Sequence, residues 1–312
     1  MRALVTGAGG FVGPVLVQHL RERGDDVTGV DQHDGPDLLD PDGWIDLLCG
    51  IQPDAVYHLA GWSDVGGSWS QPVRTFRVNA EGTLHVLQAA RRAGVGRVLV
   101  ISSADVYGTC SPEEVPLTED HPVDPRSPYG ASKVAAEVLA RRAWRGDGLE
   151  AVIARPFNHI GPGQSTSFVA PALAERIAAA ELAGGGVVRH GDLSPRRDLT
   201  DVRDVVRAYR LLVEAGEPGA TYNVCSGRDL AMAELLELLV RQARAPISTE
   251  VDPALLRPVD LPVLRGSYTR LHERTGWSPE IDVGRTVADV LDHARQRASD
   301  RHQAVQHRAG GH

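Results

Sequence analysis

The chain has 312 residues, of which 42% are hydrophobic and 24% charged, and its net charge is −8. This composition is typical of a globular protein large enough for two lobes, and the negative charge disfavours binding to nucleic acid or to an anionic membrane. The three cysteines lie far apart without the spacing of metal ligands, so we expect no metal site. The chain shows neither a signal peptide nor a long apolar span, and we expect a cytoplasmic protein.

Strand-like and helix-like segments alternate from the start of the chain. Short β-rich runs are predicted at residues 2–5, 27–30, 55–59, 98–101 and 151–154. Helical patterns are predicted between them, at residues 12–23, 44–49, 73–93 and 129–143. This alternation predicts an α/β fold in which helices cover a doubly wound, Rossmann-type parallel sheet.

Loops rich in glycine and proline follow the last of these strands and indicate a change of lobe. We expect residues 1–157 and about 199–226 to form the first lobe, which holds the parallel sheet. A smaller, discontinuous α/β lobe is expected from about 158–198 and 227–298. Residues 299–312 show no apolar periodicity, so we expect them to form an unordered tail.

A glycine-rich loop joins the first predicted strand to the first predicted helix. Gly7, Gly10 and Gly13 follow the spacing G-x-x-G-x-x-G, which allows a tight turn, a close approach of a pyrophosphate to the backbone and close packing of helix on strand. Phe11 and Val12 open the helix, whose N-terminus supplies amide donors for phosphate oxygens. A glycine loop alone can be a simple turn, but its place between a strand and a helix predicts a dinucleotide site.

Two aspartates lie at the end of the second predicted strand and shortly after it. Asp31 ends that strand, where a carboxylate can accept hydrogen bonds from the adenosine ribose and would repel a 2′-phosphate. NAD(H) is therefore favoured as the cofactor, with NADP(H) as the alternative. Asp37 is a candidate contact to the adenine. The alternative for Asp31 is a solvated residue at the end of a strand.

Tyr129 and Lys133 stand four residues apart at the start of an apolar helical run, so the phenol and the ammonium share a helix face. A lysine beside a tyrosine stabilises the phenolate, and such a pair can move a proton near neutral pH. The same spacing also occurs in ordinary surface pairs. Whether this pair is catalytic depends on the rest of the chain.

With these pieces the chain resembles the extended short-chain dehydrogenases/reductases, in the group of nucleotide-sugar epimerases and dehydratases. The resemblance covers about residues 1–297 and includes the segments His58-Leu59-Ala60-Gly61 and Ser102-Ser103-Ala104-Asp105-Val106-Tyr107-Gly108. It implies that Leu59 and Ala60 lie against the cofactor and that Ser103 is a catalytic hydroxyl. A homodimer is also implied, in which the helices predicted at 73–93 and 129–143 pair across the interface.

Later segments resemble the branch that contains GDP-mannose dehydratases and GDP-4-keto-6-deoxymannose reductases. These segments are residues 154–164, 197–205, 222–227, 256–258 and 275–279. The resemblance implies that Asn158 binds the substrate diphosphate and that Arg197 and Arg257 hold the nucleotide and phosphates, for which the planar guanidinium is well suited. Arg189 and Phe168 are further candidates for substrate binding. Each arginine could instead be a solvated surface charge, and Phe168 could be an apolar helix position.

The residues after Ser103 distinguish the activities of this group. By resemblance, a 4,6-dehydratase carries Thr-Asp-Glu or Thr-Ser-Glu here, whereas this chain has Ser103-Ala104-Asp105, and Ala104 cannot transfer a proton. The resemblance therefore implies hydride transfer to the C4 keto group of a nucleotide-linked 4-keto-6-deoxyhexose, with GDP-4-keto-6-deoxy-D-mannose going to GDP-D-rhamnose or its C4 epimer. Tyr129 would donate the proton, Lys133 would hold the nicotinamide ribose, and Asp105 would orient a sugar hydroxyl.

Three alternatives remain at this stage. A nucleotide-sugar 4-epimerase would use the same Ser103, Tyr129 and Lys133 with retained NAD⁺. A 4,6-dehydratase is disfavoured by Ala104. A dinucleotide-sensing protein without catalysis would have no need of the three catalytic side chains together.

Overall fold

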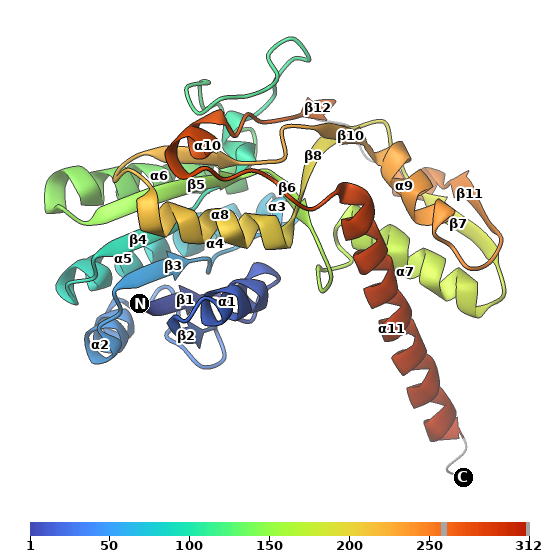
Figure 1. Cartoon of the computed structure of the whole chain (residues 1–312), viewed down its shortest axis with the longest axis horizontal. Helices are drawn as coiled ribbons and strands as arrows, with labels where there is room; N and C mark the ends of the chain where they lie inside the picture. Colours follow the sequence, from blue (N-terminus) through green and yellow to red (C-terminus); the bar gives the residue numbers. More distant parts are fainter. Residues whose placement is uncertain (257–260, 310–312) are drawn as a thin grey trace.

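The computed structural model describes residues 1–256 and 261–309, with side chains described as far as residue 303. In this part of the chain, six strands form the central sheet of the first lobe (Figure 1). The strands are β1 (Arg2–Thr6), β2 (Asp26–Val30), β3 (Ala55–His58), β4 (Arg97–Ile101), β5 (Glu150–Pro156) and β9 (Thr221–Val224). Their order is β2-β1-β3-β4-β5-β9 and each neighbouring pair is parallel, which confirms the predicted doubly wound sheet.

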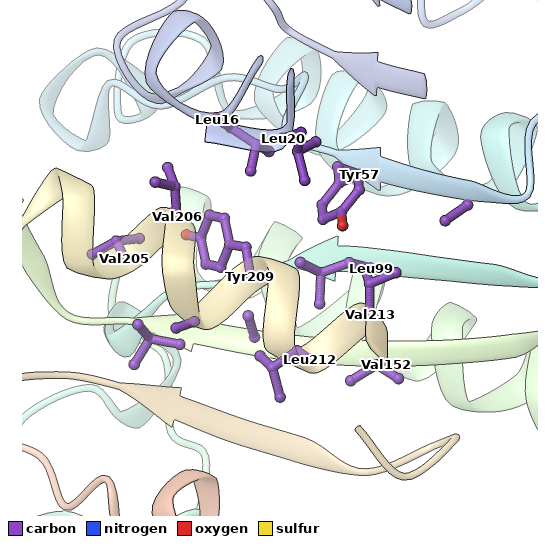
Figure 2. Close-up of a cluster of buried hydrophobic side chains, with 14 of the residues drawn as sticks. Leu16, Leu20, Tyr57, Leu99, Val152, Val205, Val206, Tyr209, Leu212 and Val213 are labelled. Atoms are coloured by element: carbon purple, nitrogen blue, oxygen red, sulfur yellow. The ribbon is translucent and has the colours of Figure 1, made fainter. Parts of the chain in front are cut away.

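Helices cover both faces of this sheet because its strands are apolar on both sides. One face is covered by α1 (Val12–Glu22) and α8 (Val202–Ala215), and the other by α2 (Pro41–Ile51), α5 (Gly82–Arg92) and α6 (Pro128–Asp147). Figure 2 shows the first of these cores, which contains Leu16 and Leu20 of α1, Tyr209 and Leu212 of α8 and Tyr57 of β3.

The segment predicted as one helix over residues 73–93 is divided in the structure. It consists of α4 (Pro72–Phe76), a π-helical segment (Arg77–Glu81) and α5. The short helix α3 (Val65–Ser68) precedes α4 and was not predicted, because its sequence Val-Gly-Gly-Ser has no apolar periodicity. The wider π-turn holds the buried side chain of Asn79, which lies against the start of α6.

The second lobe has its own core, formed by the helices α7 (Val169–Leu182), α9 (Met232–Arg241) and α11 (Val283–Ala309). Two small sheets accompany them: β10-β8-β12 with β6 paired to β8, and β11-β7. Their strands are β6 (Asn158–Ile160), β7 (Gly186–His190), β8 (Arg196–Asp201), β10 (Asp229–Ala231), β11 (Ile247–Val251) and β12 (Val263–Leu264). The short 3-10 turn at Pro253–Leu255 follows β11.

The boundary between the lobes differs from the predicted one in two places. Strand β8 belongs to a small sheet as far as Asp201, so the chain rejoins the first lobe with α8 rather than at residue 199. In addition, α10 (Thr269–Thr275) returns to the first lobe, since Leu271 and Trp277 are buried in the core that α1 and α8 form. The Trp277 indole donates to the Asp204 carbonyl at 3.0 Å.

The expectation of an unordered tail from residue 299 is wrong as far as Ala309, because α11 continues to that residue. Ala298 is buried against the second lobe, and Arg297 and Arg301 both pair with Glu175 of α7, at 3.6 Å and 3.1 Å. Contacts between charged side chains of two helices are not visible in apolar periodicity, which is why the sequence did not predict this part of α11. Among the described residues, no helix combines the length and apolarity that crossing a bilayer requires.

Candidate active site

The glycine loop forms a close-packed cradle at the carboxyl end of β1. Gly7 has a φ of +70°, and a Cβ there would lie 2.8 Å from the Ala60 backbone nitrogen. A Cβ on Gly13 would lie 2.4 Å from the Gly7 carbonyl oxygen, whereas one on Gly10 would meet only that oxygen, at 3.3 Å. Helix α1 begins at the loop without a side-chain cap from Phe11. Its first amides therefore remain available to an anion, and the cradle fits a dinucleotide pyrophosphate.

Asp31 lies directly against this loop. Its Oδ2 accepts from the Gly9 backbone nitrogen at 2.9 Å, and its Oδ1 accepts from the Gln32 nitrogen at 2.6 Å. Asp34 accepts in turn from the Asp31 backbone nitrogen at 2.7 Å. Asp37 is exposed nearby and accepts from the Leu39 nitrogen at 2.8 Å. This acidic rim suits the hydroxyls of an adenosine ribose and opposes a 2′-phosphate.

The His58 side chain stabilises the glycine loop through hydrogen bonds, a role that the sequence did not predict for it. The imidazole is buried between the Thr6 hydroxyl, 2.9 Å from Nδ1, and the Thr83 hydroxyl, 3.1 Å from Nε2. The Thr6 hydroxyl also accepts from the Ala60 nitrogen at 3.0 Å, which fixes the Leu59-Ala60 backbone beside Gly7. Burial lowers the pKa of His58 to about 3, and the charge of Lys133 adds to this effect, so the imidazole is neutral.

The three predicted catalytic side chains meet at the carboxyl end of β4. Ser103 follows β4, while Tyr129 and Lys133 occupy successive turns at the start of α6, which Ser127 caps by accepting from the Gly130 nitrogen. All three are buried, with exposed fractions of 7–8%, so water has little access to the phenol. The Lys133 Nζ lies 5.8 Å from the centre of the Tyr129 ring and donates to the Ile101 carbonyl at 2.9 Å.

The electrostatics differ from the expected lysine-stabilised phenolate. Burial raises the pKa of Tyr129, the Asp105 carboxylate raises it further, and the nearby Ser103 hydroxyl opposes the rise. The Lys133 ammonium is directed to the Ile101 carbonyl instead of the phenol oxygen, and burial lowers its own pKa to about 8. Tyr129 is therefore protonated at neutral pH, which is the form that a proton donor requires.

Asp105 connects Ser103, the predicted catalytic serine, to the predicted substrate side. Its Oδ2 accepts from the Ser103 hydroxyl at 2.8 Å. Burial raises the pKa of Asp105, and the hydrogen bond from Ser103 and the charge of Arg197 act in the opposite direction. Arg197 is half-buried, and its charge is felt by Asp105 across the site.

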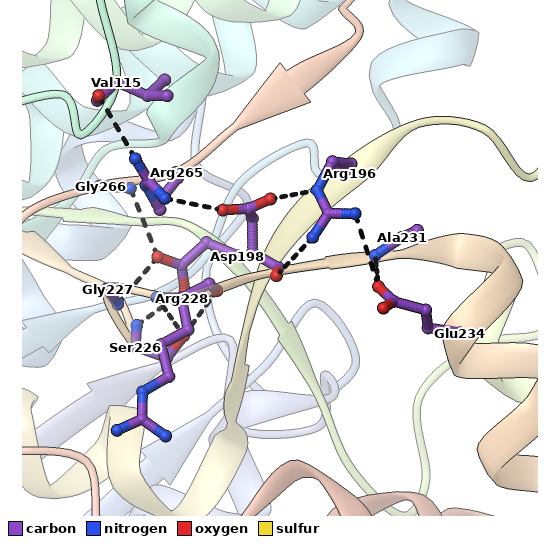
Figure 3. Close-up of polar contacts among 11 residues, drawn as sticks. Val115, Arg196, Asp198, Ser226, Gly227, Arg228, Ala231, Glu234, Arg265 and Gly266 are labelled. Carbon is purple, nitrogen blue, oxygen red and sulfur yellow. Dashed lines mark hydrogen bonds and ion pairs between the residues drawn. The ribbon is translucent and has the colours of Figure 1, made fainter. Parts of the chain in front are cut away.

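The neighbours of Arg197 on β8 face the other way, because side chains alternate along a strand. Arg196 pairs with Asp229, which also accepts from Arg265 at 3.0 Å. Figure 3 shows Arg196 and Arg265 in this group of polar contacts. The Asp198 carboxylate accepts from the Ser226 hydroxyl at 2.6 Å and from the Ser226 backbone nitrogen at 2.7 Å. These pairs fix β8 on both sides of Arg197, whose guanidinium donates to the Arg196 carbonyl at 2.9 Å.

The other predicted substrate residues are placed less uniformly. Asn158 is exposed at the start of β6, which pairs with β8 through Leu199. Phe168 is 42% exposed at the N-terminus of α7. Arg189 is exposed on β7 and pairs with Glu250 at 3.8 Å, and no contact in the described part of the chain joins it to the catalytic residues. Arg257 lies outside the described residues.

A ring stack joins the cofactor loop to the second lobe, and sequence reasoning missed it. The rings of Phe11 and His159 are 5.8 Å apart at an interplanar angle of 4°. The His159 Nδ1 lies 3.0 Å from the Phe157 carbonyl, and the His159 carbonyl accepts from the Gln164 side chain at 3.0 Å. No pattern in the sequence connects two residues so far apart, although both fall within motifs that were singled out.

Comparison with known proteins assigns this arrangement to a family. Residues 3–225 match the NAD dependent epimerase/dehydratase family, which is most of the chain. The chain belongs to this family. As a member, it is an enzyme of the extended short-chain dehydrogenase/reductase type and uses NAD(H) or NADP(H) as its cofactor.

Individual relatives cover almost the whole chain. It is 40% identical to the GDP-6-deoxy-D-mannose reductase of Pseudomonas aeruginosa, over 96% of this chain and 99% of that protein. The structure of RMD from Pseudomonas aeruginosa complexed with NADPH has a TM-score of 0.89 and 39% identity, and it covers 95% of this chain and 100% of that one. The chain is also 35% identical to the UDP-glucose 4-epimerase of Mycolicibacterium smegmatis, over 96% of this chain and 100% of that protein.

Proposed function

We propose that the protein reduces the C4 keto group of a nucleotide-linked 4-keto-6-deoxyhexose, with GDP-4-keto-6-deoxy-D-mannose as the substrate and GDP-D-rhamnose or its C4 epimer as the product. The observation that carries this proposal is the geometry of the site, in which the buried phenol of Tyr129 lies with Ser103 and Lys133 at the carboxyl end of β4. A carbonyl reduction needs a proton donor at this position. The 40% identity to a GDP-6-deoxy-D-mannose reductase supports the same substrate class.

The side chains divide the reaction between them. When bound, the reduced nicotinamide supplies the hydride for C4. Tyr129 holds the proton that passes to the developing alkoxide, and the Ser103 hydroxyl donates to the same oxygen. To do so, Ser103 turns away from the Asp105 Oδ2, which becomes free to accept from a sugar hydroxyl. Lys133 holds the nicotinamide ribose, and its positive charge favours the phenolate once the proton has left.

Substrate binding is proposed for residues around β6 and β8. Arg197 faces Asp105 from β8, and Asn158 lies on the neighbouring strand, so the two can hold a diphosphate between them. Phe168 is an exposed ring at the start of α7 and is proposed as a contact to the nucleotide. Arg189 and Arg257 are retained only on the family resemblance, since Arg189 pairs with Glu250.

A 4-epimerase is the second candidate, because the chain also resembles a UDP-glucose 4-epimerase. That reaction begins with oxidation of an alcohol, for which Tyr129 must accept a proton. The identity to the GDP-6-deoxy-D-mannose reductase is higher, at 40% against 35%, and favours the reductase. Dehydration is disfavoured because Ala104, which is buried, has no group that can transfer a proton.

We propose NADH as the preferred cofactor. Asp31 and Asp34 present carboxylates at the glycine loop, and a 2′-phosphate would be repelled there. The similar Pseudomonas aeruginosa structure contains NADPH, so the two cofactors should be compared directly. A kcat/KM about fivefold higher with NADH is the expected result, since an unfavourable charge contact at an exposed site costs about 1 kcal/mol.

A homodimer is proposed from an exposed apolar patch, defined as Trp69, Val73, Phe76 and Val138. These side chains are 50–72% exposed and lie on α6, on α4 and just before α4. Helices α4 and α6 contact each other, so the patch can form one side of a four-helix interface with a second copy. We also propose a cytoplasmic location, where nucleotide sugars and nicotinamide cofactors are available.

The decisive experiment combines the protein with freshly prepared GDP-4-keto-6-deoxy-D-mannose and either NADH or NADPH. We expect the nicotinamide absorbance to fall and NMR to show a GDP-6-deoxyhexose with a hydroxyl at C4. Absence of oxidation with both cofactors would overturn the reductase proposal. Interconversion of C4 epimers of a nucleotide sugar with catalytic NAD⁺ would instead identify an epimerase.

A further inference from the structure

We propose that Glu137, held by Arg155, is a positioning residue that sets helix α6 against the end of β4 and so places Tyr129 and Lys133 opposite Ser103. The inference rests on the proposed reduction for its activity assay. It concerns a buried ionised group that no step of the reaction uses.

The proposed catalytic side chains come from two separate elements, whose relative position has to be fixed by contacts between them. Ser103 follows β4, whereas Tyr129 and Lys133 are on α6, and a long connection separates them in sequence. Their relative position must therefore be set by contacts between α6 and the end of β4. One contact is the hydrogen bond from Lys133 to the Ile101 carbonyl. A second contact is formed by Glu137, which lies one helical turn further along α6.

Glu137 is 1% exposed and accepts four hydrogen bonds. Its Oε1 accepts from the Ser102 hydroxyl at 2.6 Å and from the Arg155 Nε at 2.7 Å. Its Oε2 accepts from Arg155 Nη2 and from Arg141 Nη2, each at 2.7 Å. Burial raises the pKa of Glu137, but the bonds from Arg155 outweigh it and the net pKa is lowered, so the side chain is an ionised carboxylate. Ser102 is the residue immediately before the catalytic serine.

Arg155 connects the same carboxylate to the turn that carries Ser103. It lies near the end of β5, is 3% exposed and forms a two-pronged ion pair with Glu137. Its guanidinium also stacks 4.9 Å from the centre of the Tyr107 ring, in the turn that Ser103 begins. The Tyr107 hydroxyl is fixed in turn by a 2.7 Å bond to Asn223 of β9. One guanidinium thus contacts both α6 and the serine turn.

A buried ion pair of this kind contributes little net stability, since the desolvation of both charges offsets their attraction. What it does contribute is a defined geometry, because a planar guanidinium and a carboxylate match in one arrangement. Displacement of a catalytic group by about 1 Å can cost on the order of a hundredfold in rate. Within the described part of the chain, neither Glu137 nor Arg155 forms a hydrogen bond with Tyr129 or Lys133. The two residues therefore act through the backbone of α6 and through Ser102.

The test compares Glu137→Gln with Glu181→Gln. Glu181 forms an equivalent two-pronged pair with Arg295, at 2.7 Å for both bonds, but in the second lobe between α7 and α11. We expect Glu137→Gln to lower kcat by about tenfold or more, with KM for the sugar nucleotide changed less than about twofold. Glu181→Gln should keep the wild-type kcat, whatever it does to the melting temperature.

A second readout does not need turnover. In crystal structures of the unliganded protein, the 2.9 Å hydrogen bond from Lys133 Nζ to the Ile101 carbonyl should be kept in the wild type and in Glu181→Gln and lost in Glu137→Gln. This readout separates the positioning role from the proposed reaction: if the wild-type enzyme reduces no 4-keto sugar, the position of Lys133 still tests Glu137.

The double variant Glu137→Met/Arg155→Met covers the case in which the single variant does not fold, since apolar replacement of both partners removes the two buried charges together. Arg141, whose side chain is 31% exposed, keeps its hydrogen bond to Thr221 and its access to water. The double variant should fold and show the same loss of kcat and the same loss of the Lys133 bond to Ile101. Wild-type kcat and an unchanged Lys133 position in a folded variant would overturn the proposal, as would an equal loss of kcat in Glu181→Gln.

Discussion

Tyr129 and Lys133 share a helix face, as their spacing of four residues predicts, but their polar atoms have different partners. Lys133 is bound to the Ile101 carbonyl, and the phenol lies beside Ser103 and the Asp105 carboxylate. The pKa of the phenol is set by burial and by Asp105, and both keep the proton on the oxygen. Burial raises the pKa of Tyr57 and Tyr209 in the same direction, so the position of Tyr129 beside Ser103, more than the shift itself, points to a proton donor.

The first prediction concerns this proton. Tyr129→Phe should lower kcat by at least about a hundredfold, because the alkoxide loses its proton donor, and should leave NADH affinity nearly unchanged. Steady-state kinetics and a fluorescence titration with NADH measure the two quantities. Turnover near the wild-type value would show that another group supplies the proton.

The second prediction concerns His58, whose folded-state pKa of about 3 lies below the unfolded value of 6.5. Between these values the unfolded chain binds the extra proton, so the stability that neutral His58 supports is complete above pH 6.5 and is lost as the pH falls. Between pH 7.5 and 5.0 the wild type should lose about 2 kcal/mol more unfolding free energy than His58→Gln. Urea unfolding at both pH values measures this, and parallel losses in the two proteins would contradict it.

At the scale of elements, the strand–loop–helix unit at the N-terminus shows how a motif becomes a site. Position 7 requires glycine because its φ is positive, and position 13 requires glycine because the Gly7 carbonyl lies too close for a side chain. Asp31, at the end of the next strand, accepts a hydrogen bond from the loop. The π-helical segment before α5 contacts the helix that carries Tyr129 and Lys133. Its Asn79 donates to Ser132 of α6 at 2.9 Å.

The third prediction follows from the packing of Gly13. Gly13→Ala would bring a methyl group within 2.4 Å of the Gly7 carbonyl oxygen, so the loop must open and the phosphate cradle must change shape. NADH affinity should fall by at least about tenfold, as measured by calorimetry, because several backbone hydrogen bonds to phosphate depend on this cradle. Gly50→Ala is the matched control, since no atom lies within 4 Å of a Cβ there. Equal affinities for the two variants would argue against the cradle.

At the scale of the whole molecule, the two lobes differ in what they contribute. The first lobe is a rigid sheet with helices on both faces, and the second provides strands β6 and β8 beside the catalytic residues. The apolar patch on α4 and α6 lies on the first lobe, so dimerisation would leave the second lobe free to admit substrate.

The fourth prediction tests this assembly. Light scattering should give the wild type a mass about twice the 33.5 kDa of one chain, and Phe76→Glu/Val138→Glu should be monomeric, because two charges would have to be buried at the interface. Leu182→Glu, which alters an equally exposed apolar side chain on α7, should stay dimeric. A monomeric wild type would remove the proposed interface.

Sequence patterns predicted the first lobe far better than the second. Its strands are continuous apolar runs and its glycine loop has a defined spacing, so their places follow from local rules. Contacts between distant segments have no such pattern: the stack of Phe11 on His159 and the pairing of Glu137 with Arg155 appear only once the chain is folded. Arg189 shows that residue type alone does not locate a site. It is an arginine, which suits phosphate, but it pairs with Glu250 at the surface.

The return of Leu271 and Trp277 to the core of the first lobe limits how this enzyme can be re-engineered. The chain leaves that lobe after β5, comes back with α8 and β9, leaves again and comes back with α10 before ending in α11. Exchange of one contiguous segment for that of a relative would therefore remove part of the sheet's covering along with the substrate-binding strands. A chimaera with new sugar specificity must carry separate grafts, at about 158–201 and 225–268, and keep Trp277 native.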